Sequence, residues 1–483
     1  MVIERRKFLV NTLWSFLGQS STFVIGLITN IILARILGPF EFGQVGIVMF
    51  FVLVINVLID GGLGGALIRL KTATDEDYST VFLFNLAISI IFFLLLIASS
   101  GTIAAYYNNT KLQPLICASA IMIIISAFNV VQSARIYREM KFKVNLYITL
   151  FSVIISSVLG IYLAVRGEGV WSVVLMYIVQ IFIKTVLMWF SEGGVGKMVF
   201  NMQSFKGMYR YGIYVTLITF FNNAFDNIYQ LLLGKYFSIR EVGFYYQAKR
   251  IQGVPFFILN SLTLGVIFSH LSKFQDDRAL FQKEYLKILS VFSIAIGAVA
   301  SLIFLLSNDA VHIVLGDVWM NSIVYMRLLT IASFFLLLKV FSQNVCKVFN
   351  RTDKIFIWEL IAMLMQVITI VIGVLMKSIF ITMCGAIVSN LVAYVINAFF
   401  SWRLLGLNYK GEFVLISKIS SSAILSIFIS NLIGSIHVNV IIHVLLIVFG
   451  FLLVYVASLK LWGLPTVSYL VNVFKNSRQN VDI

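Results

Sequence analysis

Polar side chains recur along one face of a long apolar segment near the N-terminus, residues 8–33. Its members, spaced three or four residues apart, are Asn11, Ser15, Gln19, Thr22, Gly26 and Asn30. This spacing keeps side chains on one face of a helix. Adding 200 to each number gives a second face that is polar at most positions, namely Tyr211, Val215, Thr219, Asn222, Asp226 and Gln230. Hydrogen bonds between helices would explain either set, but two matching sets favour faces that line a polar cavity. We predict substrate contacts at four amides: Gln19, Asn30, Asn222 and Gln230.

Asp226 is the most informative acidic residue, because it lies well inside its apolar segment. An ionisable group at that depth costs several kcal/mol unless it faces a cavity or has a partner. Asp226 is therefore either an ion-coupling site or half of a structural pair with Lys249 or Arg250. Asp60 and Glu359 are further candidates for ion coupling, although both fall near predicted cytoplasmic helix ends.

Basic residues also fall inside apolar segments or at their rims: Lys184, Lys249, Arg250, Arg327 and Lys339. Taken singly, each is typical of a long side chain that reaches for the membrane interface. Taken together, against so few buried acids, they predict an interior of positive potential that suits an anion such as a phosphate. We predict substrate binding at four of them: Lys249, Arg250, Arg327 and Lys339.

These residues are set in a very apolar chain. Hydrophobic residues make up 60% of the 483 residues, charged residues only 12%, and the mean hydropathy is +0.99. A soluble chain carries roughly 25% charged residues, so we predict an all-α polytopic membrane protein. About fourteen segments are long enough to cross ~30 Å of hydrocarbon. They lie near 8–33, 42–67, 80–101, 112–132, 145–165, 170–190, 211–233, 247–270, 285–306, 321–345, 358–376, 380–401, 416–436 and 440–461.

Lys and Arg are distributed unevenly between the two sets of loops. Of the 36, 25 lie in the set that contains the N-terminus, 6 in the opposite set and 5 in or beside helices. Cytoplasmic loops carry the excess of basic residues, so both termini are predicted to be cytoplasmic. The net charge of +16 is then an orientation signal that meets anionic lipid headgroups, rather than a sign of nucleic-acid binding.

A weak internal repeat appears at an offset of 200 residues. Residues 33–46 align without gaps on residues 233–246. The matched pairs include Leu33 and Leu233, Arg35 and Lys235, Glu41 and Glu241, and Gly43 and Gly243. We infer two parallel six-helix lobes, 1–200 and 201–405, followed by two helices and a tail in 406–483. Parallel repeats of this kind are typical of transporters whose lobes rock around a central site.

Enzyme and cofactor signatures are missing from the sequence. Cys117, Cys346 and Cys384 are scattered, and the histidines show no metal-ligand spacing. No nucleophile elbow, phosphate-binding loop or dinucleotide fingerprint occurs, so we expect no cofactor, no metal and no catalysis.

Three segments resemble bacterial polysaccharide flippases: ILARILGPFEFG (32–43), QSARIYREMKFK (132–143), and the stretch from GFYYQAKRIQGVPF to HLSKFQDD (243–277). These flippases are the O-antigen and exopolysaccharide translocases of the multidrug/oligosaccharidyl-lipid/polysaccharide exporter superfamily. The resemblance implies alternating-access transport of undecaprenyl-diphosphate-linked oligosaccharide from the inner to the outer leaflet of the bacterial cytoplasmic membrane. It further implies a cationic cavity with Lys249 and Arg250 as its leading basic residues, and a polysaccharide polymerase and chain-length proteins as partners. At 268–270 the chain reads Phe-Ser-His, where the family commonly has a proline before the serine.

Two rival functions remain open at this point. A multidrug cation antiporter of the same superfamily would need more acids inside the lobes, and residues 8–33 contain none. A membrane polysaccharide polymerase would need a substantial catalytic loop, whereas the longest outer loop predicted here is only 306–321.

Overall fold

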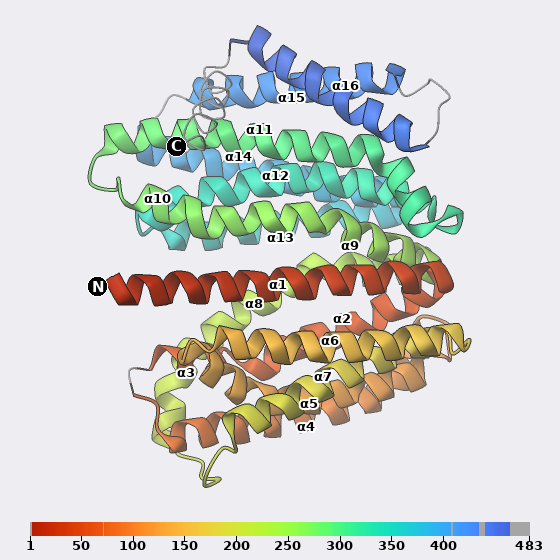
Figure 1. Cartoon of the computed structure of the whole chain (residues 1–483), viewed down its shortest axis with the longest axis vertical. Helices are drawn as coiled ribbons and strands as arrows, with labels where there is room; N and C mark the ends of the chain where they lie inside the picture. The colour runs from red at the N-terminus through yellow and green to blue at the C-terminus, as the bar shows by residue number, and fades with distance from the viewer. Residues whose placement is uncertain (1, 71, 407–408, 434–439, 464–483) are drawn as a thin grey trace. The chain divides into compact units, whose positions relative to one another are not determined.

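The computed structural model describes residues 2–70, 72–406, 409–433 and 440–463. Throughout these residues the chain is helical or forms short connections, and no strand occurs in them (Figure 1). The chain divides into two units, Met1–Tyr246 and Gln247–Ile483. We call them the first and the second unit and describe each by itself.

The first unit contains nine helices or parts of helices in its described residues. They are α1 (Val2–Ile36), α2 (Pro39–Asp60), the short α3 (Leu63–Arg69), α4 (Asp75–Tyr106), α5 (Leu112–Arg138), α6 (Phe142–Val165), α7 (Val170–Glu192), α8 (Met202–Tyr236) and the first turns of α9 (Ile239–Leu262). The closest pairs are α4 with α5, α1 with α6, and α6 with α7, while α2 packs on both α5 and α8.

The second unit begins inside α9. It continues through a π-helical turn η1 (Thr263–Ile267), α10 (Phe268–Ser272), α11 (Arg278–Ala310), η2 (Val311–Leu315), η3 (Asp317–Trp319), α12 (Ser322–Val348), α13 (Thr352–Leu375), α14 (Ile379–Leu405), α15 (Tyr409–Ile433) and α16 (Val440–Leu461). Here α12 and α13 both pack on α14, and the α15–α16 pair packs on α11.

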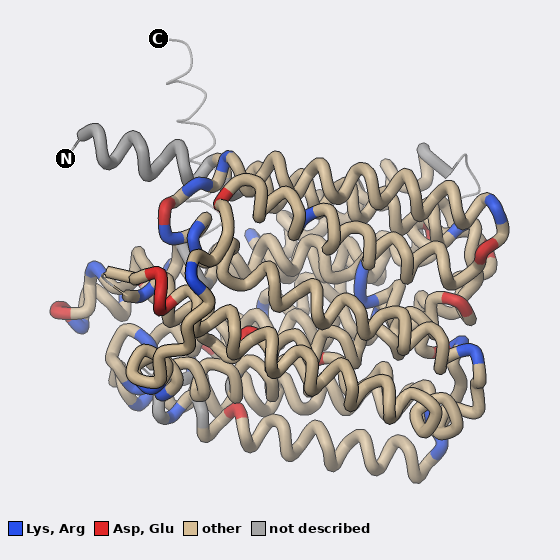
Figure 2. The backbone as a smooth tube through the Cα atoms, turned by 90° about the horizontal axis from the view of Figure 1, so that it is seen from below, with Lys and Arg blue, Asp and Glu red and all other residues tan. Residues whose placement is uncertain are grey.

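The prediction of an all-α polytopic membrane protein is confirmed. Twelve helices in the described residues are long and apolar enough to cross a membrane. Charged residues gather near the helix ends, with long uncharged stretches between them (Figure 2). The two other long helices, α8 and α9, coincide with predicted spans but carry the polar residues singled out above. The count of fourteen spans and the cytoplasmic placement of both termini stay predictions.

A buried carboxylate fixes α15 within the second unit. Glu412 is 1% exposed and accepts hydrogen bonds from Trp402 Nε1 at 2.6 Å, Tyr394 Oη at 2.8 Å and Tyr285 Oη at 3.4 Å. The three donors come from α11 and α14. A buried charge is tolerated where several donors satisfy it, so this group ties the start of α15 to two other helices.

Two repeat-related glycines contact each other's helices within the first unit. A Cβ on Gly43 would lie 1.8 Å from the carbonyl oxygen of Ile239, and a Cβ on Gly243 would lie 1.8 Å from that of Pro39. Pro39 and Ile239 are also 200 residues apart, so the contact is reciprocal. Reciprocity is the mark of a local twofold relation, and it supports the repeat proposed from the sequence. The lobe boundaries at 200 and 405 remain a proposal.

Candidate functional site

The predicted polar face of α1 is only partly open to a ligand. Gln19 is exposed, whereas Asn30 is 4% exposed and its Oδ1 has no hydrogen-bond partner. Next to it, Thr29 Oγ1 contacts Ser157 Oγ at 2.8 Å and so joins α1 to α6. Hydrogen bonding between helices therefore occurs at Thr29, beside the predicted stripe. The side chains of Asn11 and Ser15 lie outside the described residues.

On α8 the polar side chains form a ladder along the helix. Asn223 Nδ2 donates to Thr219 O at 2.8 Å, and Asn227 Nδ2 donates to Asn223 O at 2.9 Å. Gln230, which is 4% exposed, continues the ladder through a 3.3 Å contact from its Nε2 to Asn227 Oδ1. Asn223 and Asn227 were not among the predicted site residues, although they are four residues apart, the spacing from which the polar faces were predicted.

Beside this ladder, Asn222 and Asp226 are both exposed in the first unit. They lie one residue before Asn223 and Asn227, respectively. Because residues i and i+4 share a helix face, Asn222 and Asp226 present a polar edge next to the ladder.

In the second unit, the structure pairs two residues for which separate roles were predicted. Lys339 Nζ of α12 lies 3.0 Å from Glu359 Oε1 of α13, and Lys339 is 8% exposed. Gln343 Nε2 also donates to Glu359 Oε1, at 2.7 Å. The two charges therefore neutralise each other, and the positive potential predicted around Lys339 is reduced.

Arg327 lies near the N-terminal end of α12. Its Nε donates to Ser307 Oγ at 2.8 Å, and its guanidinium carbon lies 5.0 Å from the centre of the Phe304 ring. Both partners belong to α11, so Arg327 joins two helices of the second unit. Lys249 and Arg250 are adjacent and half-buried on α9.

Asp60 borders an open cavity at the surface of the first unit. The cavity measures about 320 Å³ and lies between the α2–α3 corner and α5. Its lining comprises Asp60, Gly64, Gly65, Ile68, Ser126, Asn129, Val130, Ser133, Ala134 and Tyr137. The corner forms because Gly61 and Gly62 adopt φ of 55° and 63°, a left-handed conformation that costs other residues energy. The Gly64 backbone N–H then donates to the Asp60 carboxylate.

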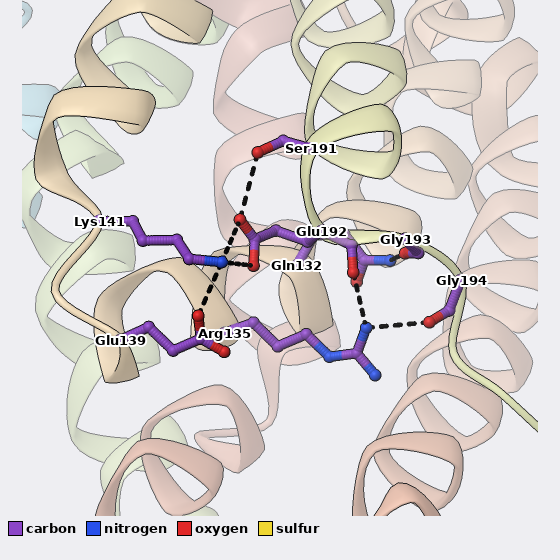
Figure 3. Close-up of polar contacts among 8 residues, drawn as sticks. All are labelled: Gln132, Arg135, Glu139, Lys141, Ser191, Glu192, Gly193 and Gly194. Carbon is purple, nitrogen blue, oxygen red and sulfur yellow. Dashed lines mark hydrogen bonds and ion pairs between the residues drawn. The ribbon is translucent and has the colours of Figure 1, made fainter.

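The α5 helix continues from this cavity into a network that fixes its end against α7 (Figure 3). Arg135 Nη1 donates to the carbonyl oxygens of Glu192 and Gly194 at 3.1 and 2.9 Å. Gln132 Nε2 donates to that of Gly193 at 2.9 Å. Arginine near a helix C-terminus satisfies the last carbonyls of the helix. From the sequence, Arg135 was interpreted only as a basic residue that orients the protein in the membrane. Its structural role could not be predicted, because it depends on where the end of α7 lies.

The α5–α6 turn adds an ion pair to the same network (Figure 3). Lys141 Nζ lies 2.7 Å from Glu139 Oε2 and 3.0 Å from Glu192 Oε2. The hydrogen bonds to Glu139 and then to Glu192 raise the pKa of Lys141 above its ordinary value. No cluster of three or more His, Cys, Asp or Glu that could hold a metal occurs in the described part of the chain.

The long apolar helices define a multi-pass membrane protein, and comparison with known structures agrees on the fold. The solved structure of the lipid II flippase MurJ in an inward closed conformation matches 93% of this chain and 99% of its own, with a TM-score of 0.71 and 15% identity. An inward-facing multidrug resistance MATE family transporter matches 80% and 94%, with a TM-score of 0.61 and 15% identity. At these identities the likeness establishes the fold alone.

Sequence comparison identifies the family. A family model described as "Polysaccharide biosynthesis protein" matches residues 32–324, and the chain belongs to this family. An uncharacterized membrane protein in the cps region of Klebsiella pneumoniae is 25% identical over 333 residues, 68% of each chain. The succinoglycan biosynthesis transport protein ExoT of Rhizobium meliloti is 22% identical over 64% of this chain and 63% of its own, somewhat under two thirds of its length. The lipopolysaccharide biosynthesis protein WzxC of Escherichia coli is 24% identical over 68% and 67%.

Proposed function

We propose that the protein is a flippase that moves undecaprenyl-diphosphate-linked oligosaccharide from the inner to the outer leaflet of the bacterial cytoplasmic membrane. Membership of the polysaccharide biosynthesis family is the observation that carries this proposal. The polar features described above support it, because they occur on helices of an otherwise very apolar chain.

The physical problem for such a substrate is the loss of hydrogen bonds in the hydrocarbon. A polar group moved from water into an apolar environment without a partner costs roughly 2–7 kcal/mol. An oligosaccharide has many hydroxyls, so unaided crossing is negligibly slow. Exposed Gln19 of α1 and Asn222 of α8, together with the half-buried ladder amides Asn223 and Asn227, are groups that can replace the lost bonds.

The charged residues would serve the carrier and the energy source. Lys249 and Arg250, half-buried on α9, are proposed to hold the diphosphate while the polyprenyl tail stays in lipid. Asp226, exposed beside the α8 ladder, is proposed to take up and release the coupling proton. Glu359 and Asp60 stay secondary candidates for coupling, since Glu359 already pairs with Lys339. A polysaccharide polymerase and chain-length proteins would act on the product in the outer leaflet.

Complementation tests the proposal. The gene, introduced into flippase-deficient strains that each make one defined surface glycan, should restore that glycan at the surface of at least one strain. The Asn227→Leu variant, which removes the centre of the ladder, should reduce restoration, whereas Ser119→Ala on α5, buried and away from the ladder, should not. Raised drug resistance without glycan restoration would favour the antiporter instead.

A further inference from the structure

The cavity beside Asp60 has the size and the chemistry of a small-molecule site. Its volume of about 320 Å³ falls at the lower end of the range of roughly 300–1,000 Å³ that is usual for such sites. Apolar groups such as Ile68 and Val130 form much of the wall, with a few polar groups between them. A pocket of this volume suits a single sugar ring rather than a whole repeat unit.

The polar groups in the wall mostly accept hydrogen bonds. Ser126 Oγ gives its proton to Met122 O at 2.7 Å, and Ser133 Oγ contacts Asn129 Oδ1 at 3.4 Å. Each serine oxygen thus keeps lone pairs for a ligand, and the Asp60 carboxylate can only accept when it is ionised. Asn129 Nδ2 and the hydroxyl of Tyr137 add donors. Such a wall fits a ligand with several hydroxyl groups, because each hydroxyl can donate one hydrogen bond and also accept hydrogen bonds.

The charge of the wall argues against the diphosphate as the occupant. None of the ten lining residues is basic, and the one charged group, Asp60, is acidic. A carboxylate repels a phosphate at close range. The basic residues next to the lining in the sequence, Arg69 after Ile68 and Arg138 after Tyr137, are not part of it.

From these observations we infer that the cavity between the α2–α3 corner and α5 is a sugar subsite. It accepts one ring of the lipid-linked headgroup through Asp60, Asn129, Ser126 and Ser133, with the Tyr137 ring as an apolar wall. The inference rests on the proposed function and adds to it a subsite within a single unit. Asp60 is thereby a hydrogen-bond acceptor for the ring, in place of a coupling site.

Two variants alter the cavity in independent ways. Asn129→Leu removes the amide while nearly keeping its size. Gly65→Leu fills the cavity, and a Cβ on Gly65 meets no atom within 4 Å, so its backbone has room for the change. Ser119→Ala, buried on the same α5 helix but outside the lining, is the matched control. Thermal unfolding of each variant verifies that it is folded before binding is measured.

Binding is measured on the full chain in nanodiscs with three probes: the lipid-linked oligosaccharide extracted from a flippase-deficient strain that the protein complements, the free oligosaccharide released from it, and bare undecaprenyl diphosphate. Asn129→Leu should weaken binding of the lipid-linked oligosaccharide about tenfold, the equivalent of one lost hydrogen bond. Gly65→Leu should weaken it at least as much, because it excludes the ring, and neither variant should change binding of the bare carrier. If the free oligosaccharide binds the wild-type protein but not Gly65→Leu, the cavity binds sugar without the lipid. If binding is detected only for the lipid-linked oligosaccharide, the lipid carrier is needed to bring the sugar ring to the cavity.

Asp60→Asn separates sugar binding from cation binding, because it keeps an acceptor oxygen and removes the charge. The sugar subsite predicts a loss of less than about threefold in binding of the lipid-linked oligosaccharide, independent of sodium. Three results would each overturn the subsite. The cavity variants could weaken binding of both lipid probes equally, binding could depend on sodium and be abolished by Asp60→Asn, or Gly65→Leu could bind with wild-type affinity. If no strain is complemented, the proposed function itself fails, an outcome distinct from a translocating wild type whose cavity variants bind normally.

Discussion

Replacing Gly43 by alanine tests the close backbone contact between α2 and the start of α9. The added Cβ would lie 1.8 Å from Ile239 O and 2.8 Å from the carbonyl carbon of Ile239. Real Cβ atoms essentially never approach other atoms within 3.0 Å, so α2 and the start of α9 must separate by about 1.2 Å. Gly243→Ala creates the same conflict from the other helix, against Pro39 O at 1.8 Å.

Two opposing effects set the size of the change. Overpacking of this kind costs about 1–3 kcal/mol, while replacing a helical glycine by alanine returns about 0.5–1 kcal/mol. Each single variant should therefore lose about 1–2 kcal/mol in the free energy of unfolding. One separation of the helices relieves both conflicts, because each glycine opposes the turn that precedes the other. The double variant should lose no more than either single variant, which gives a coupling energy of about 1–2 kcal/mol.

The unfolding free energy can be measured in mixed micelles by titration with sodium dodecyl sulfate, followed by circular dichroism and by a thiol-reactive dye that reports exposure of buried Cys346. Gly253→Ala is the matched control on α9, since its Cβ meets nothing within 4 Å. It should be neutral or stabilise the protein by up to about 1 kcal/mol. Neutral single variants at 43 and 243, or a double variant whose loss is the full sum, would refute the reciprocal contact.

Three further predictions concern the polar groups. Lys339→Met should destabilise the protein by about 1–3 kcal/mol, because it removes the cation paired with the partly exposed Glu359, and adding Glu359→Met should restore most of the loss in the same titration; equal stability of single and double variants would contradict the pairing. Glu412→Gln places an amide where the two tyrosine hydroxyls and the indole now donate to the carboxylate, and it should lower the free energy of unfolding by about 1–3 kcal/mol. The near-ultraviolet circular dichroism of these aromatic residues should change, and an unaltered spectrum would argue against the three hydrogen bonds. The raised pKa of Lys141 means that its contribution to stability is complete below pH 10.5 and is lost as pH rises through the higher folded-state pKa. Because more than a third of its side chain is exposed, it should contribute under about 1 kcal/mol, and Lys141→Met should flatten that alkaline loss.

Much of the architecture is predictable because the membrane imposes a simple rule on composition. Long apolar runs predicted the helices, and the offset of 200 residues brought out Gly43 and Gly243, which the structure places in reciprocal contact. The polar character of α8 and α9 was equally visible, since both fall short of the hydropathy of the twelve apolar spans.

The pairing of side chains between helices was not predictable in the same way. Lys339 and Glu359 meet because of the rotation of α12 and α13 about their axes, and hydropathy contains no information on that rotation. The same holds for Glu412, whose donors Tyr394 and Trp402 come from the preceding helix and Tyr285 from a helix much earlier in the chain. Asp60 was noticed as a charge, but its cavity depends on the α2–α3 corner packing against α5.

The most direct test of the central claim is a leaflet assay with purified protein in liposomes. Lipid-linked oligosaccharide, fluorescently labelled on the glycan, is placed in both leaflets, and an impermeant reagent then quenches the label outside. The account predicts that wild-type protein makes nearly all the label accessible over time, whereas protein-free liposomes stop near half. A wild-type protein that binds the substrate yet leaves the protected half unchanged, with or without a proton gradient, would contradict the account.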